Sequence, residues 1–239
     1  MNVKFFILIF VSYLICGPGI AYVSKIKGNV KYKKKTEKEF KAPNKGTELY
    51  NNDFIATGDD GFAKYVYLDD GTQIKIHSNS EVYIRGEVER RSIIKQLKIE
   101  EGTVKFDVKK QSLDEFTVIT PTSVASVKGT SFWIDCNGKD GDQFFGESGS
   151  VTIQNRESGE KRKLTKNKVA NSMPDGSLKV REMTPSELEM LRNIEEETGE
   201  SQNTDNDTGN TSSQSGENEI IIELQDDSGN QKTITIKVK

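Results

Sequence analysis

The residues of this chain that could do chemistry are few and lie far apart. The tripeptide KGT at 128–130 resembles part of a phosphate-binding loop, but such a loop needs a preceding glycine, a Gly-Lys-Ser/Thr order and a helix after it. Here glycine and lysine are in reversed order, and the following SFWI at 131–134 is typical of a strand. We therefore interpret this stretch as part of a sheet rather than as a nucleotide site.

The histidine and cysteine content also argues against catalysis. His77 is the only histidine, which excludes a multi-histidine metal site and leaves any nucleophile one candidate base. It falls on the polar face of a strand-like segment beside a turn, where we expect a solvated side chain. Cys136 is expected to be a small buried hydrophobe. The sequence predicts a protein that is not an enzyme and has no cofactor.

Acidic turns raise the question of a calcium site. They are DDG at 59–61, DDG at 69–71 and DGD at 140–142, and none has the D-x-D-x-D-G spacing with a later glutamate. Aspartate next to glycine is also common in tight turns, since aspartate bonds its own backbone and glycine adopts positive φ. A turn role is favoured, so no metal site is predicted. For the lysines at 33–35 we expect a solvated hairpin tip.

The elements that must position these residues are short β-strands. Apolar and polar residues alternate over strand lengths at 63–68, 72–78, 81–85, 95–100, 103–109, 116–120 and 150–155. Turn signals rich in Gly, Asp and Asn separate them, including those at 58–61, 69–71, 78–80 and 101–102. The pattern predicts an all-β domain of stacked short strands and hairpins, solenoid- or sandwich-like. Each sheet is expected to have one solvent-exposed face.

The N-terminus has the pattern of a signal peptide. Lys4 precedes an apolar run at 5–15, and small residues lead up to Ala21, after which we expect cleavage, so that residues 1–21 are the signal. An uncleaved anchor needs about 20 apolar residues, and GPG at 17–19 ends the run early, so membrane attachment is expected only if the segment stays uncleaved. Lipidation at Cys16 is a third alternative, disfavoured by the bulky Ile15.

The C-terminal part changes character twice. Residues 184–199 predict a short helix, because Thr184 and Glu187 form a capping box with Pro185 at the first helical position. Residues 200–218 are acidic and polar, which predicts a disordered, flexible linker. Residues 219–239 alternate again around a turn and predict a C-terminal β-hairpin. A two-stranded hairpin is marginal alone in water, so we expect it to dock on the chain's body or on a partner.

Four motifs, in order along the chain, resemble the FecR domain, named for the iron-dicitrate transport regulator. They are G-x-x-L-x-x-x-D-x-I-x-T-G at 46–58, D-G-T at 70–72, E-G-T-V at 101–104 and T-P-x-x-x-x-x-V-x-G-T-x-F at 120–132. The matching residues, called the signature residues below, are Asp53, Thr57, Gly58, Asp70, Gly71, Gly102, Thr120, Pro121, Gly129, Thr130 and Phe132. The resemblance implies a structural role for them in a FecR-like all-β domain over residues 22–180.

The resemblance also implies a class of function. Regulators of this family join a cytoplasmic segment that contacts a sigma factor to a periplasmic domain, whereas only residues 1–4 precede the apolar run here. We expect an exported module without the anti-sigma segment, in the periplasm or cell envelope or secreted, which acts in protein interaction or signalling. Its expected partner is an envelope protein or a cell-wall component.

Other partner classes are less favoured. A formal net charge of −3 over 239 residues gives no reason to expect nucleic acid, and no small-molecule substrate is predicted. The alternative function is a carbohydrate- or peptidoglycan-binding envelope protein. That reading predicts an exposed aromatic face.

Overall fold

The computed structural model describes residues 17–111, 115–136, 141–199, 219–225 and 231–237. Most of the predicted signal peptide and the predicted linker at 200–218 lie outside the described residues. The chain divides into two compact units, one up to Ile194 and one from Glu195 onward, which are considered separately below.

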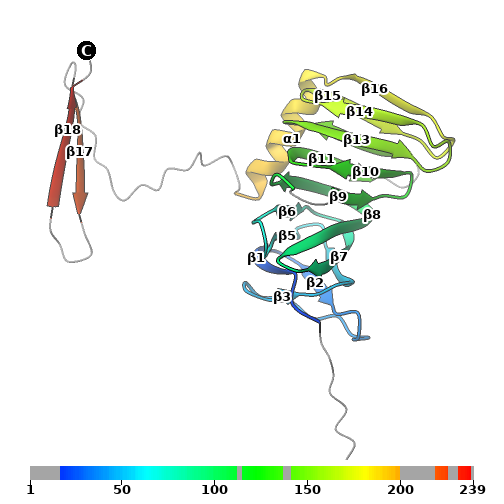
Figure 1. Cartoon of the computed structure of the whole chain (residues 1–239), viewed down its shortest axis with the longest axis horizontal. Helices are drawn as coiled ribbons and strands as arrows, with labels where there is room; N and C mark the ends of the chain where they lie inside the picture. Colours follow the sequence, from blue (N-terminus) through cyan, green and yellow to red (C-terminus); the bar gives the residue numbers. More distant parts are fainter. Residues whose placement is uncertain (1–16, 112–114, 137–140, 200–218, 226–230, 238–239) are drawn as a thin grey trace, which may run out of the picture. The chain divides into compact units, whose positions relative to one another are not determined.

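Two sheets, here called A and B, make up the first unit (Figure 1). Sheet A contains, in spatial order, β3 (Glu48–Leu49), β1 (Ala21–Lys27), β5 (Phe62–Tyr67), β6 (Gln73–Ile76), the second half of β8 (Ser92–Val108), β11 (Thr130–Cys136), β12 (Asp142–Gly146), β15 (Lys168–Ser172) and β16 (Leu178–Glu182). Sheet B contains β2 (Val30–Lys33), β4 (Asp53–Thr57), β7 (Glu81–Glu89), the first half of β8, β9 (Phe116–Ile119), β10 (Ser123–Val127), β13 (Ser150–Asn155) and β14 (Lys161–Thr165). The prediction of an all-β domain is confirmed.

Hairpins within one sheet alternate with crossings to the other sheet. The pairs β5–β6, β11–β12 and β15–β16 are hairpins of sheet A, while β9–β10 and β13–β14 are hairpins of sheet B. Between them the chain crosses at 28–29, 58–61, 77–80, 128–129, 147–149 and 166–167. The turn signals in the sequence located both kinds of connection but did not distinguish them, because glycine and aspartate serve both.

The core lies between the inner faces of the two sheets. Alternation buries one side of each strand, so Ile55, Val82 and Leu97 of sheet B meet Tyr65 and Ile74 of sheet A in one cluster. The rings of Phe106 and the signature residue Phe132 stack with centroids 4.6 Å apart. This face-to-face burial supplies most of the stabilisation, since no disulfide is present among the described residues.

Strand β8 corrects one prediction. The segments at 95–100 and 103–109 were expected to be separate strands joined by a turn at 101–102, but β8 runs through both. Its pairing with β7 shifts register beside Glu101, and from Gly102 onward it pairs with β11 in sheet A. Gly102 has φ of 99°, and a Cβ there would lie 2.1 Å from the hydroxyl oxygen of Ser80. The glycine therefore marks a bulge at which one strand changes sheets.

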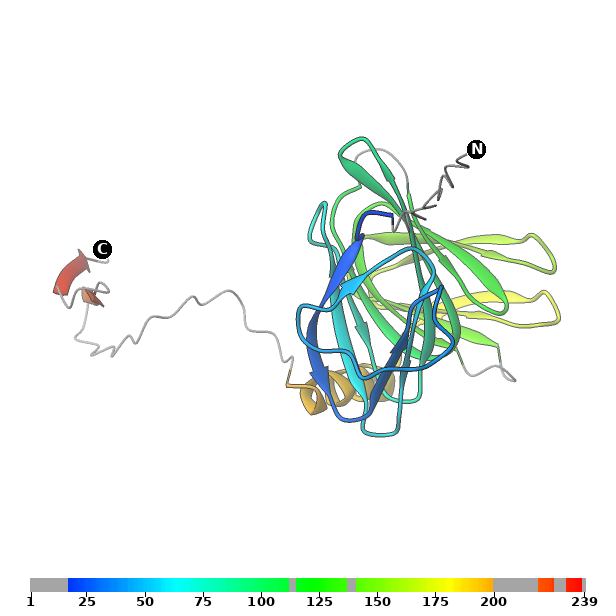
Figure 2. The same ribbon diagram turned by 90° about the horizontal axis from the view of Figure 1, so that it is seen from below.

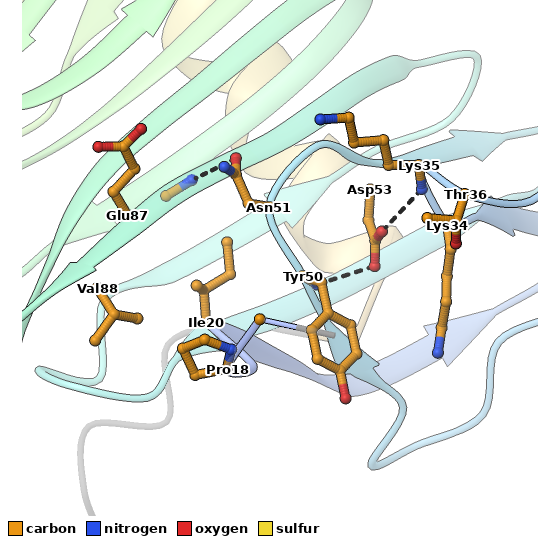
Figure 3. A pocket seen from close by; sticks show the side chains of 12 residues that line it. Pro18, Ile20, Lys34, Lys35, Thr36, Tyr50, Asn51, Asp53, Glu87 and Val88 are labelled. Carbon is orange, nitrogen blue, oxygen red and sulfur yellow. Dashed lines mark hydrogen bonds between the residues drawn. The ribbon is translucent and has the colours of Figure 1, made fainter. Parts of the chain in front are cut away.

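A buried carboxylate fixes the chain before β4. Asp53 is 1% exposed, and its carboxylate accepts hydrogen bonds from the backbone N–H of Tyr50 at 2.9 Å and of Lys35 at 3.2 Å (Figure 3). Burial raises the pKa of this carboxyl, while the two N–H groups and the nearby Lys34 oppose that effect. The signature aspartate thus ties two loops to the start of a core strand.

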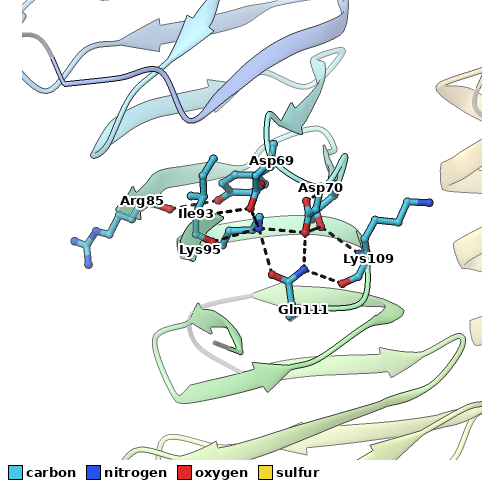
Figure 4. A network of polar contacts seen from close by, with 9 residues as sticks. Asp69, Asp70, Arg85, Ile93, Lys95, Lys109 and Gln111 are labelled. Carbon is cyan, nitrogen blue, oxygen red and sulfur yellow. Dashed lines mark hydrogen bonds and ion pairs between the residues drawn. The ribbon is translucent and has the colours of Figure 1, made fainter. Parts of the chain in front are cut away.

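A buried lysine ties the β5–β6 turn to β8 (Figure 4). The Lys95 ammonium lies 2.7 Å from Asp69 and 3.1 Å from Asp70, with only 1% of its side chain exposed. Gln111 completes the network, since its carbonyl oxygen accepts from Lys95 at 3.2 Å and its amide donates to Asp70 at 2.7 Å. Hydrogen bonds from Thr72, Gln111 and Lys95 lower the pKa of Asp70 against the opposing effect of burial.

One helix, α1 (Pro185–Glu197), follows β16. Its capping box forms as predicted: Thr184 N donates to the Glu187 carboxylate at 2.8 Å, and Glu187 N donates to the Thr184 hydroxyl at 3.3 Å. Leu191 packs with Trp133 and Phe145 on the outer face of sheet A, and Figures 1 and 2 both show the helix on one side of the two sheets.

The second unit contains the predicted C-terminal hairpin. Strand β17 (Glu219–Gln225) pairs antiparallel with β18 (Gln231–Lys237), and Ile222 stands opposite Ile234 in the register. The turn between them lies outside the described residues.

Replacing Gly102 should destabilise the fold severely. Gly102→Ala combines left-handed backbone strain with the clash against Ser80, so we expect a loss of about 2–5 kcal/mol in the free energy of unfolding. Gly46→Ala is the matched control, because Gly46 has φ of 88° with nothing near its missing Cβ, and it should cost about 1–2 kcal/mol. Urea unfolding measures both, and equal losses would contradict the steric role of Gly102.

Removing the buried lysine should also be costly. Lys95→Met leaves Asp69 buried without its cation, which should cost about 3–5 kcal/mol in denaturant unfolding. Lys98→Met is the control, because Lys98 pairs with Glu100 at 2.5 Å with about a third of both side chains exposed, and it should cost less than about 1 kcal/mol. A Lys95 variant as stable as the control would show that the network is dispensable.

The helix cap should make stability depend on acid pH. The Arg181 guanidinium, at 2.6 Å, lowers the pKa of Glu187 from 4.5 to about 2, assisted by Thr184. This contribution is present above pH 4.5 and is lost as pH falls toward 2, because protonation breaks the pair. Thermal unfolding between these pH values should show a smaller fall in Tm for Glu187→Gln than for the unaltered protein. Parallel curves would contradict the assignment.

Candidate functional site

The signature residues do not converge on one site. Most lie at turns and sheet crossings, where several hold backbone groups together, while Phe132 packs in the core. Thr57 at the end of β4 donates its hydroxyl to His77 O at 2.5 Å and accepts from Ser80 N at 3.0 Å. At the next residue of the chain, the carbonyl of the signature residue Gly58 accepts a hydrogen bond from Asn79 N at 3.0 Å. These contacts join successive crossings to each other, so the polar groups of these residues are used within the fold.

The segment around the KGT tripeptide at 128–130 uses polar groups in the same way. Gly129 has φ of 152° at the crossing from β10 to β11, where a Cβ would lie 3.0 Å from Lys110 Cα. The Thr130 hydroxyl donates to the carbonyl of Ser148 at the neighbouring crossing. The strand predicted at 131–134 is present as part of β11, and the strand before the glycine, β10, belongs to the opposite sheet.

The Thr-Pro turn encloses a buried carboxylate that the sequence analysis did not identify. Asp142 is 1% exposed and accepts hydrogen bonds from the Thr120 hydroxyl at 2.5 Å and from Thr122 N at 2.9 Å, and also from the Thr122 hydroxyl. Pro121 itself is exposed. Asp142 belongs to an acidic turn that suggested only a tight turn or calcium, and the threonines are 20 residues or more away in sequence.

Cys136 lies buried beside this carboxylate. The side chain is 1% exposed, and burial, followed by the negative charge of Asp142, raises the pKa of its thiol well above 9.0. The thiolate that a nucleophile or metal ligand requires is therefore not available near neutral pH. The prediction of a small buried side chain is confirmed.

The prediction of a solvated His77 is wrong. This residue is 3% exposed and lies between Phe62 and Trp133, with ring centroids 5.4 and 4.9 Å away. Its neighbours come from β5 and β11, so alternation within its own segment could not reveal them. Trp133 is 1% exposed and is likewise part of the packing rather than a ligand platform.

The acidic turns do not assemble a metal site within the described parts of the chain. Asp60 accepts a hydrogen bond from Asn29 N at 2.9 Å, which links the crossing at 58–61 to that at 28–29, and Asp69 and Asp70 are paired with Lys95. Asp140 lies outside the described residues.

A groove of about 430 Å³ opens next to the start of the domain (Figure 3). It is lined by Pro18, Tyr50, Asp53 and the lysines Lys34 and Lys35, among others. The Lys34 ammonium lies 5.0 Å from the centre of the Tyr50 ring, so the lysine run is packed against the groove rather than forming a free hairpin tip. Both Asp53 oxygens accept backbone N–H groups, so the groove has a cationic wall at Lys34 and Lys35 and an exposed acid, Glu87, elsewhere in its lining.

The outer face of sheet B carries a row of side chains at one register, all half-exposed except Phe54, which is buried. Successive strands align Lys33, Phe54, Tyr83, Lys98, Ile119 and Val124, which we call the outer row. The ring of Phe40, 49% exposed, lies 5.8 Å from that of Phe54, which in turn lies 4.8 Å from Tyr83. The one helix in the described regions packs on sheet A, so it leaves this row uncovered.

Comparison with known proteins places the domain in a family. Residues 53–152 match the family described as FecR protein. Two crystal structures of a "putative anti-sigma factor" from Parabacteroides distasonis ATCC 8503 are similar at 19% and 20% sequence identity, each with a TM-score of 0.48 and coverage of 58% of this chain and 64% of the other. The chain therefore spans less than two thirds of those proteins. The search of curated proteins found no match.

Among the described residues, no helix has both the length and the apolar character needed to cross a membrane. The matched region begins at Asp53 in β4 and ends at Thr152 in β13. It contains the signature residues and the change of sheet at Gly102. Residues 53–152 of this chain are a FecR family domain.

Proposed function

We propose that this protein is an exported, non-enzymatic FecR-domain module that binds a protein of the cell envelope and acts in interaction or signalling. The observation that carries the proposal is the outer row of sheet B. It offers two aromatic side chains between Lys33 and Lys98, and two aliphatic ones beyond Lys98, on an uncovered sheet face, and apolar side chains rimmed by polar ones are typical of interaction surfaces.

The use of the polar residues supports a binding role over catalysis. His77, Cys136 and Asp142 are all buried, and the last two are enclosed among structural contacts. An enzyme needs such groups to converge on a pocket where substrate can reach them. The export part of the proposal rests on the N-terminal segment, with its apolar run at 5–15.

The sheet edges and the C-terminal hairpin offer a second means of contact. Among the described residues, strand β14 pairs only with β13, so its other side is an open edge there, and its residues Lys161, Arg162 and Lys163 are exposed. A cationic edge discourages association with like strands and favours an acidic partner strand. Within the described part of the chain, strands β17 and β18 pair only with each other, which is why we expect them to add a partner strand or face.

The alternative, a carbohydrate- or peptidoglycan-binding protein, is favoured by one feature. Phe40, Phe54 and Tyr83 form a short aromatic patch, and aromatic rings are suited to stacking against sugar faces. Of the three, Phe54 is only 7% exposed, which limits the platform to its two neighbours.

Site-specific photocrosslinking tests the proposed surface. A photoreactive residue in place of Tyr83 should give a discrete protein adduct in intact cells, because the outer row contacts the partner. Tyr22, on β1 of sheet A and 37% exposed, is the matched control and should give several-fold less adduct. Equal yields at both positions, or none, would contradict a partner on sheet B.

Two further experiments distinguish the remaining hypotheses about what the protein binds and which part binds it. Retention of the protein by purified cell-wall material, lost in Tyr83→Ser, would favour the carbohydrate-binding alternative. Truncation before Glu219 should reduce the adduct yield if the hairpin helps to hold the partner, whereas an unchanged yield assigns binding to the FecR domain alone.

A further inference from the structure

The boundary between exposed and buried chain lies between Gly19 and Ile20. Gly17 and Pro18 are exposed and Gly19 is half-buried, whereas Ile20 and Ala21 are 1% and 0% exposed. Ile20 belongs to the same core cluster as Ile84 and Ile93. The folded domain therefore begins two residues before the end of the predicted signal peptide.

Backbone hydrogen bonds also indicate that the folded domain begins at Ile20. Ile20 N donates to Leu49 O at 2.9 Å, and Ile20 O accepts from Leu68 N at 3.1 Å. Ala21 stands opposite both Leu49 of β3 and Tyr67 of β5, so it is held from both sides. A cut after Ala21 would remove a buried side chain, leave a void in the core and orphan the Leu68 N–H.

We propose that export processing cleaves the Gly19–Ile20 bond, so that the mature protein begins at Ile20. This inference rests on the export included in the proposed function. Gly17 and Gly19 supply small residues at the third and first positions before the cut, the pattern that a leader peptidase reads. Water adds across the peptide bond, leaving a carboxylate on Gly19 and an ammonium group on Ile20.

The surroundings of the Ile20 nitrogen are suited to the new positive charge of the ammonium group. The Ile20 nitrogen already donates to Leu49 O, and a Cβ built on Gly19 would lie 3.7 Å from a carboxylate oxygen of Glu48. The ammonium group would thus face an acceptor and an acid at the surface. Loss of Gly17 and Pro18 would also remove part of the wall of the groove, which becomes wider in the mature protein.

Fractionation and N-terminal sequencing of the protein from producing cells test the proposal directly. The exported form should begin Ile-Ala-Tyr-Val, with an intact mass to match. An exported protein that begins at Tyr22, at a lipid-modified Cys16 or at Met1 would overturn the cleavage site while leaving export in place. Protein found only in the cytoplasm would overturn the export part of the proposed function as well.

Substitutions in the exposed segment distinguish the two cuts. Gly17→Leu places a bulky residue at the third position before Ile20, so precursor should accumulate or the N-terminus should shift. For a cut after Ala21 the same residue is further away and should have no effect. Pro18→Ala is the control and should leave processing unchanged. Normal processing of Gly17→Leu to Ile20 would overturn the proposal.

Stability supplies a readout that does not depend on export. Purified forms that begin at Ile20 and at Tyr22 should differ in Tm by at least about 5 °C, the shorter form being less stable because it lacks Ile20 and Ala21. Equal Tm values would show that these residues are dispensable and would remove the physical reason for the proposed site.

Discussion

The passage of β8 from sheet B to sheet A is the constraint on which the domain depends. One strand supplies hydrogen-bond partners to β7 and β9 before Gly102 and to β6 and β11 after it. The sheets are therefore joined in their middle by a continuous backbone, and the register of each is fixed relative to the other. Because Ser80 lies directly against Gly102, the crossing from β6 to β7 is fixed at the same point.

The FecR signature is largely explained by the cost of burying polar groups. Because the chain crosses repeatedly between the two sheets, some of its turns lie in the protein interior. Unpaired backbone groups would be costly there. Thr57, Thr120 and Thr130 satisfy such groups with hydroxyls, and Asp53 does so with a carboxylate. These residues have the types expected at an active site, but their hydrogen-bonding capacity is used within the fold.

A feature could be predicted from the sequence when its signal lies within one short segment of the chain. Alternation over 63–68 or 81–85 reports which side of a strand is apolar, so strands, core and the capping box at Thr184 could be predicted. Glu101 and Gly102 resemble a turn because glycine at positive φ also occurs in bulges, and only the pairing of β8 with β11 resolves this. His77 resembled a solvated residue because the aromatic rings that bury it come from other strands.

The sequence by itself determined the all-β class, the order of strands and turns, the likeness to the FecR family and the capped helix. Each of these depends on neighbouring residues or on motif spacing. Only the tertiary structure decided which turns cross between sheets, which groups donate hydrogen bonds to Asp142, which carboxylates pair with Lys95, which row of sheet B is left uncovered and that Ile20 belongs to the core. These features depend on contacts between residues far apart in sequence, and the period of a strand carries no information about which strand will lie beside it.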